Sequence, residues 1–185
     1  MMQRAFRNFY WGFLFVMVDF RLNGLDILPD IIGYAFFIAG LNLLKERNDR
    51  FRKARIFHIV MLFLSIFNIF ERQVESTEGI NFYFNSFEFL IGILILIFTL
   101  LAMYNLFMAI KQLAEDYSYT DLSFEADQRW KQFVILQIAS SITFLFIFIP
   151  ILGFAYIFAV LIFAIWLTVK FMGFMTRCGS RFSEE

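Results

Sequence analysis

The residues that could take part in chemistry gather in one short segment, between the first two apolar runs of the chain. Asp19, Asp26 and Asp30 lie within this segment, and Glu88 lies at the start of a later apolar stretch. Ionisable residues beside long apolar runs are costly to bury and commonly mark ion or substrate sites. We therefore expect these four carboxylates to form the candidate polar site, with a cation or a polar substrate as the ligand that it would take.

The same segment also has a purely structural interpretation. Asp26 is a good N-cap residue, and Asp30 would place its negative charge at the positive end of the following helix. Small residues at Gly33, Ala39 and Gly40 would let a neighbouring helix approach closely. The sequence leaves both interpretations open, helix capping and a polar site at the outer surface.

The elements that must position these residues are predicted from the distribution of apolar residues. Of the 185 residues, 61% are hydrophobic and 17% are charged, against roughly 45–50% and about 25% in soluble domains. Long apolar blocks alternate with short charged ones along the chain, as helical spans alternate with loops. We expect a single all-α domain over residues 1–185, a polytopic bundle of transmembrane helices.

Six spans are predicted from the apolar runs and the roughly 20 residues that cross a bilayer. Pro150 and Gly153 divide the last long run into two helices. The first three runs reach span length only with polar flanking residues, so an alternative has four spans and a re-entrant hairpin made by the first two helices. The six spans are expected near residues 6–20, 29–44, 56–70, 86–110, 132–149 and 153–172.

Lysine and arginine are distributed very unevenly over the predicted loops. With six spans, fourteen cationic residues fall on the side of the two termini, and only Arg21 and Arg72 fall on the other side. Cytoplasmic segments of membrane proteins carry an excess of these residues. The pattern predicts a multi-pass protein of the cell membrane with cytoplasmic N- and C-termini. The first run lacks a small-residue cleavage site, so we interpret it as a retained span.

A second group of candidate residues is the basic segment between the second and third apolar runs. Topology alone explains such a segment, because it falls on the predicted cytoplasmic side. The sharper interpretation is a contact with anionic lipid headgroups, since each cation next to the membrane contributes about 1 kcal/mol at such a surface. The residues that would make this contact are Arg47, Arg50, Arg52, Lys53 and Arg55.

Several classes of function are not indicated. The net charge is zero, so the chain offers no overall basic field for nucleic acid. One Cys and one His exclude an internal disulfide and the common metal centres built from several His or Cys residues. The sequence contains no P-loop, no zinc-protease motif and no nucleophile elbow. We therefore expect the chain not to be an enzyme, and we expect no cofactor and no metal site.

The string D-x4-G-x-D-I-L-P-D-I-I-G-Y, from Asp19 to Tyr34, carries a resemblance. Followed by a short apolar helix and a basic segment, it resembles small polytopic membrane proteins of Gram-positive bacteria. The resemblance covers roughly residues 9–55. It implies a bacterial plasma membrane and supplies no catalytic residues.

Two functions fit these observations. Short helices and small residues favour a scaffold or regulatory subunit of a membrane complex, whose partners are the lipid bilayer and another membrane protein or a second copy. Alternatively, the size and topology resemble the substrate-binding subunits of energy-coupling factor vitamin importers, which implies a transport subunit with a small-molecule ligand. The chain departs from those subunits at Tyr10–Phe20, which contains none of the alanines of their docking helix.

Overall fold

The computed structural model describes the backbone of residues 1–17, 21–22, 25–26, 30–71, 86–146 and 150–183, and the side chains of residues 1–17, 30–65, 90–143 and 151–183. The described residues form six α-helices and one short antiparallel hairpin, in which Arg21 lies opposite Asp26. The helices are α1 (Met2–Met17), α2 (Asp30–Leu44), α3 (Asp49–Glu71), α4 (Ser86–Asp116), α5 (Thr120–Phe146) and α6 (Pro150–Arg181), and the strands are β1 (Arg21–Leu22) and β2 (Leu25–Asp26). The prediction of an all-α fold is confirmed.

The helix boundaries follow from local chemistry. Asn48 caps α3: its Oδ1 accepts a hydrogen bond from the Phe51 backbone N–H at 3.0 Å. Pro150 is the first residue of α6, where its fixed φ suits a helix and its missing N–H is not needed. The predicted division of the last apolar run therefore falls just before Pro150.

A tight turn joins α4 to α5. Tyr119 N–H donates to Ala114 O at 2.7 Å and Ser118 N–H donates to Glu115 O at 2.9 Å, which is the pattern of a Schellman motif. Ser118 takes the left-handed conformation that the motif requires, with φ of 61°. The inner segment predicted between the fourth and fifth spans, residues 111–131, is helical except at this turn. Opposite charges in this segment lie three or four residues apart, and this spacing stabilises a helix.

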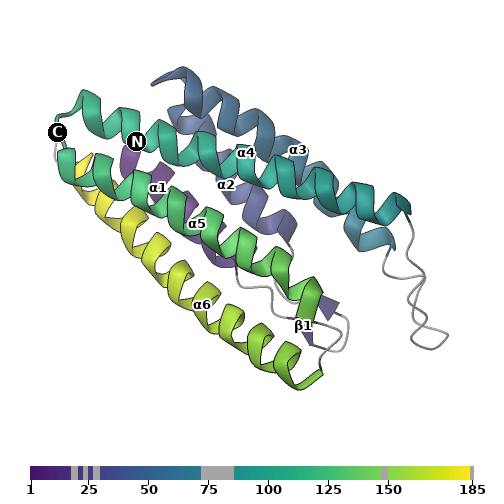
Figure 1. Cartoon of the computed structure of the whole chain (residues 1–185). Helices are drawn as coiled ribbons and strands as arrows, with labels where there is room; N and C mark the ends of the chain where they lie inside the picture. The colour runs from purple at the N-terminus through teal and green to yellow at the C-terminus, as the bar shows by residue number, and fades with distance from the viewer. Residues whose placement is uncertain (18–20, 23–24, 27–29, 72–85, 147–149, 184–185) are drawn as a thin grey trace.

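The helices form a closed ring of antiparallel neighbours. Each helix packs on the next in the chain, and α1 packs on α6 to close the ring. Both chain termini lie at one end of the bundle (Figure 1). The α4–α5 turn lies at that end as well, because its Tyr117 and Tyr119 rings contact Phe182. A hydrogen bond from Asn48 Nδ2 to Ala109 O, on α4, brings the α2–α3 turn to the same end. We call it the terminal end, and the opposite end, where α2, α4 and α6 begin, the distal end.

The core is aromatic and lies toward the terminal end. The ring of Phe13 lies 4.9 Å from that of Phe37, 5.1 Å from that of Phe171 and 5.8 Å from that of Phe107. These four side chains come from α1, α2, α4 and α6, and none has measurable exposure. Close packing of such rings holds four helices together without relying on exclusion of water.

Glycines set the distance between α1 and α2. A Cβ added at Gly40 would lie 2.5 Å from the Phe9 ring, and one added at Gly33 would lie 2.5 Å from Val16. The prediction of close helix approach is confirmed at both glycines. It is wrong at Ala39, which is exposed, because it lies on the opposite side of α2.

The distal halves of the helices are exposed and diverge. Figure 1 shows α5 and α6 separating from α3 and α4 toward the distal end. Large apolar side chains are exposed there on three helices: Leu90, Ile93, Leu94, Ile97, Ile135, Ile138, Ile151, Leu152, Phe154, Ile157, Phe158, Leu161 and Ile162. Such a surface is unusual for a protein that faces water on all sides.

Two helices in the described part of the chain are long and apolar enough to cross a membrane, at residues 90–116 and 151–181. A third apolar helix, Asp30–Leu44, is shorter. With 16 and 15 residues, α1 and α2 are roughly 24 and 22 Å long, less than the roughly 30 Å of hydrocarbon. The structure therefore confirms six helices but not six membrane spans.

Candidate functional site

The predicted outer site lies mostly outside the described side chains. Asp19 lies outside the described residues, and the side chains of Asp26 and Glu88 lie outside the described side chains. Asp30 is the first residue of α2 and is partly buried. Its negative charge lies at the positive end of that helix, as predicted. Asp26 belongs to strand β2, so its predicted role as the N-cap of the following helix is wrong.

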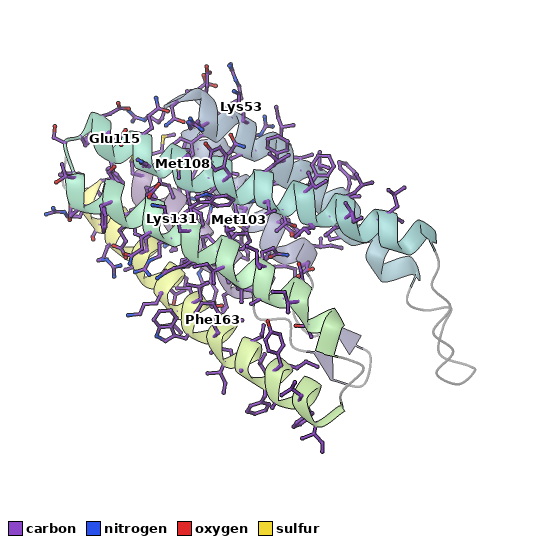
Figure 2. All side chains as sticks on the ribbon, in the orientation of Figure 1. Lys53, Met103, Met108, Glu115, Lys131 and Phe163 are labelled. Atoms are coloured by element: carbon purple, nitrogen blue, oxygen red, sulfur yellow. The ribbon has the colours of Figure 1, made fainter. Side chains whose placement is uncertain are left out.

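The basic residues of the predicted lipid contact occupy the α2–α3 turn and the first two turns of α3. Arg52 is held by Asp49 at 2.7 Å, and the Arg50 guanidinium lies over the Tyr104 ring at 5.7 Å. Arg47 and Lys53 are exposed, whereas Arg55 is partly buried. Figure 2 shows Lys53 projecting away from the bundle at its terminal end. Three of the five cations, Arg47, Arg52 and Lys53, are thus exposed, and Arg50 and Arg55 are partly buried.

A charged network, which sequence reasoning did not single out, joins α5 to α6 at the terminal end. The Glu125 carboxylate accepts hydrogen bonds from the guanidinium groups of Arg129 and Arg177. Its distance to Arg129 Nη2 is 2.6 Å. Arg129 also donates to Gln132 Oε1 at 2.7 Å. Since Arg129 is nearly buried, Glu125 supplies the charge that keeps it from being an uncompensated cation.

A second set of ion pairs, made by one aspartate and two lysines, joins α4 to α5. Asp127 lies 2.6 Å from Lys131 Nζ on its own helix and 3.7 Å from Lys111 Nζ on α4. The hydrogen bond from Lys131, helped by the charges of both lysines, holds the pKa of Asp127 below its ordinary value, against a smaller opposing effect of burial. Figure 2 shows Lys131 on α5, in the half of the bundle that includes the terminal end.

A hollow of about 480 Å³ opens beside these charges, between the end of α4 and the start of α5. Ser123 Oγ donates to Glu115 Oε1 across it at 3.0 Å. Phe124 projects from its rim with 73% of its surface exposed. The lining consists of Lys111, Glu115, Ser118, Thr120, Ser123, Phe124 and Asp127. Six of these seven lining residues are polar or charged, and the seventh is the aromatic side chain at the edge.

The sequence did contain a signal for this network. Glu125 and Arg129, and Asp127 and Lys131, are opposite charges four residues apart, the spacing that brings side chains together on a helix. This charge spacing has no meaning in a loop, and residues 111–131 were expected to form one. The partners on α4 and α6 could not have been found, because their pairing depends on how the helices pack.

The lone cysteine does not add a reactive group to the terminal end. Cys178 is fully buried in α6, so its thiol is not accessible to a reagent or a substrate. In the parts of the chain that the structure describes, no group of three or more His, Cys, Asp or Glu side chains could hold a metal ion. The described polar groups at this end form ion pairs and hydrogen bonds with one another.

Comparison with known proteins adds no relative. The chain matches no protein-family model, no curated protein and no solved structure.

Proposed function

We propose that this chain is a multi-pass protein of the bacterial cell membrane, with six crossing helices and cytoplasmic termini. The exposed apolar surface of the distal halves supports a lipid environment. The terminal end holds the chain termini and both short turns, which belong to the segments rich in Lys and Arg. Short helices α1 and α2 cross by local thinning of the bilayer or with flanking polar side chains that reach to its surface.

Single cysteines test this topology in intact cells. In a Cys178→Ala background, a membrane-impermeant thiol reagent should label Ser76→Cys, in the segment predicted to lie outside, and should leave Ser118→Cys unlabelled until the cells are opened. Ser118 is exposed in the α4–α5 turn, so burial cannot protect it. Labelling of Ser118→Cys in intact cells would contradict the proposed orientation.

Within the membrane, the chain acts as a scaffold or regulatory subunit of a membrane complex. The observation that carries this proposal is Phe124, which projects beside the polar hollow from a region braced by the ion pairs of Glu125 and Asp127. Exposed aromatic side chains on a rigid support are typical anchors of protein interfaces. The partner is a cytoplasmic segment of another membrane protein, or the same segment of a second copy.

Comparing two phenylalanine variants tests the proposal. The tagged chain is purified from its own membranes in mild detergent as wild type, Phe124→Ala and Phe154→Ala. Phe154 is as exposed as Phe124, at 72%, but lies in the distal half of α6. A protein that is recovered with wild type and Phe154→Ala, and lost with Phe124→Ala, supports the proposal. Equal recovery with all three chains would count against it.

A substrate-binding or transport subunit is the second candidate. The divergence of the helix pairs toward the distal end, near Asp30 at the start of α2, favours it. The same purification distinguishes the two functions. A coupling ATPase, or a small molecule released when the purified chain is denatured, supports transport. Another membrane protein that depends on Phe124 supports the scaffold.

A further inference from the structure

A groove lies on the outside of the bundle between α4 and α5, beyond the ion pairs of the terminal end. Leu96 and Leu100 of α4 line one side, and α5 lines the other with residues that include Val134, Gln137, Ile138 and Ser141. Its volume is about 180 Å³, whereas sites for drug-sized ligands usually have roughly 300–1,000 Å³. The groove therefore suits side chains of another helix and is too small for such a ligand.

The α5 residues of the groove form one continuous stripe, which we call the α5 stripe. They are spaced as i, i+3, i+4 and i+7, which places them on one face of the helix: Val134, Gln137, Ile138 and Ser141. Among the described elements, α5 packs on α4 and α6 alone, and Ile138 is 56% exposed beside the groove. This face of α5 is therefore open to a further helix, and it has the spacing by which packed helices interdigitate.

The α5 stripe lies at membrane depth in the topology proposed above. Trp130 and Lys131 mark the membrane boundary on α5, because Trp and Lys gather where a membrane helix meets the bilayer surface. Gln137 follows Lys131 by six residues, a rise of about 9 Å along the helix. No charged residue follows Lys131 in α5 or occurs at residues 90–110 of α4. Gln137 thus belongs to an uncharged surface inside the hydrocarbon.

The Gln137 carboxamide is the polar group of this groove that calls for a partner. Ser141 Oγ donates to the Gln137 backbone carbonyl oxygen at 2.9 Å, so the serine hydroxyl is satisfied within α5. The carboxamide itself forms no hydrogen bond with the residues that the structure describes. Water would satisfy it at an aqueous surface, but hydrocarbon cannot, and an unpaired amide in an apolar medium is costly. Gln137 therefore favours a neighbour that brings both a donor and an acceptor.

A second copy of this chain meets these requirements better than the alternatives. A lipid acyl chain would fill the groove but would offer no hydrogen bond to Gln137. A partner helix that carries a charge would find no opposite charge on this face. A second copy, inserted in the same orientation, brings an equally uncharged face and a carboxamide at the same depth. Because a carboxamide donates through its nitrogen and accepts through its oxygen, two glutamines can form two hydrogen bonds with each other.

We propose that the α5 stripe and the groove beside it are the surface by which two copies of this chain associate within the membrane. A two-fold axis along the membrane normal pairs Gln137 of one copy with Gln137 of the other. Ile138 of each copy then enters the groove of the other, beside Leu96 and Leu100. This inference rests on the membrane placement proposed above, but not on the interface proposed at Phe124, which lies at the terminal end.

A photo-reactive side chain at position 138 shows directly what covers the groove. A diazirine-bearing amino acid replaces Ile138 in the full chain, and cells that carry it are irradiated. We expect a cross-linked band at twice the mass of the chain, because a second copy lies against this position. The same amino acid in place of Ile157 is the matched control, since Ile157 is 48% exposed on α6, at about the same distance from the nearest Trp. Adducts at position 138 with lipid alone, or with a different protein, would overturn the proposal.

Gln137→Leu measures the role of the carboxamide. In a Cys178→Ala background, Ser183→Cys carries a donor or an acceptor dye, because Ser183 is exposed after the end of α6. Energy transfer in liposomes at several protein-to-lipid ratios then gives the dissociation constant of the dimer. Gln137→Leu should raise that constant by about tenfold, the effect of losing two hydrogen bonds between helices in lipid.

Two control variants separate this surface from the one at the terminal end. Ser140→Ala removes an exposed hydroxyl from the same helix outside the groove, and it should leave the dissociation constant unchanged. Phe124→Ala should also leave it unchanged. If energy transfer is lost with Phe124→Ala and kept with Gln137→Leu, the copies meet at the terminal end, and this inference is wrong while the proposed scaffold function stands.

Discussion

The terminal and distal ends of this bundle are built for different surroundings. At the terminal end, four phenylalanines from four helices fill the interior and ion pairs tie α4, α5 and α6 together. Toward the distal end, the same helices diverge and expose rows of Leu, Ile and Phe. One helix, α6, shows both patterns: Leu167, Phe171, Phe174 and Cys178 are buried, whereas eleven of the sixteen residues 151–166 are exposed.

The difference shows where the stability of the fold resides. Apolar side chains that face lipid gain little from being covered by protein, since lipid is as apolar as they are. Close packing and satisfied polar groups therefore hold the bundle together, and both are concentrated at the terminal end. Substitutions there should be costly, and matched substitutions in the distal halves should not.

The largest expected effect is at the aromatic core. Phe107→Ala removes a ring that lies 5.2 Å from Phe171 and 5.8 Å from Phe13, and should lower the free energy of unfolding by about 3 to 5 kcal/mol. Phe154→Ala, in the distal half of α6, should change it little. Denaturation of the purified chain in detergent, followed by circular dichroism, measures both. Similar losses for the two variants would mean that the distal half is as tightly packed as the terminal end.

The next effect concerns the glycine contact between α1 and α2. The methyl group of Gly40→Ala would lie 2.5 Å from the Phe9 ring and 2.9 Å from the Ala5 carbonyl oxygen. We expect a loss of about 1 to 3 kcal/mol, because backbone and a buried ring cannot both move aside.

Gly92→Ala is its matched control on α4, where an added Cβ meets nothing within 4 Å. It should be neutral, or stabilising by up to about 1 kcal/mol through helix propensity. The same unfolding measurement applies to both variants. A neutral Gly40→Ala would show that α1 and α2 are not held at this separation.

Much of this contrast was visible in the sequence. Long apolar runs predicted helices, and each of the six predicted segments begins or ends within three residues of an observed helix boundary, as at Ser86 and Leu44. Gly33 and Gly40 indicated a close helix contact because small residues have few other reasons to recur at such a spacing. These are local properties, and local chemistry determines them.

Other features depend on packing and could not be predicted. The length of an apolar run shows which part of a helix lies in lipid, but not how far the helix continues into water. The sequence therefore predicts loops at the charged ends of α4, α5 and α6, which are helical in the structure. The pairing of Glu125 with Arg177 joins residues 52 apart in sequence. Of the predicted outer carboxylates, the structure describes the side chain of Asp30 alone.

The smallest expected effect concerns acid stability at the terminal end. Because the pKa of Asp127 is lowered in the folded chain by Lys131 and Lys111, its ionised form stabilises the fold. The sign follows directly. The contribution is fully present above the ordinary aspartate pKa of about 4 and is lost as the pH falls through the lower, folded value.

Asp127→Asn should therefore lower stability slightly at neutral pH, by less than about 1 kcal/mol for a pair this exposed to solvent. It should also remove part of the loss that wild type suffers on acidification from about pH 5 to about pH 3. Asp116→Asn is the matched control, since Asp116 is exposed and forms no ion pair with any residue that the structure describes. Unfolding curves at several pH values measure the difference between the two variants. Parallel pH profiles for Asp127→Asn and wild type would mean that the α4–α5 contact is held by packing, such as that of Tyr104 on Trp130, and not by charge.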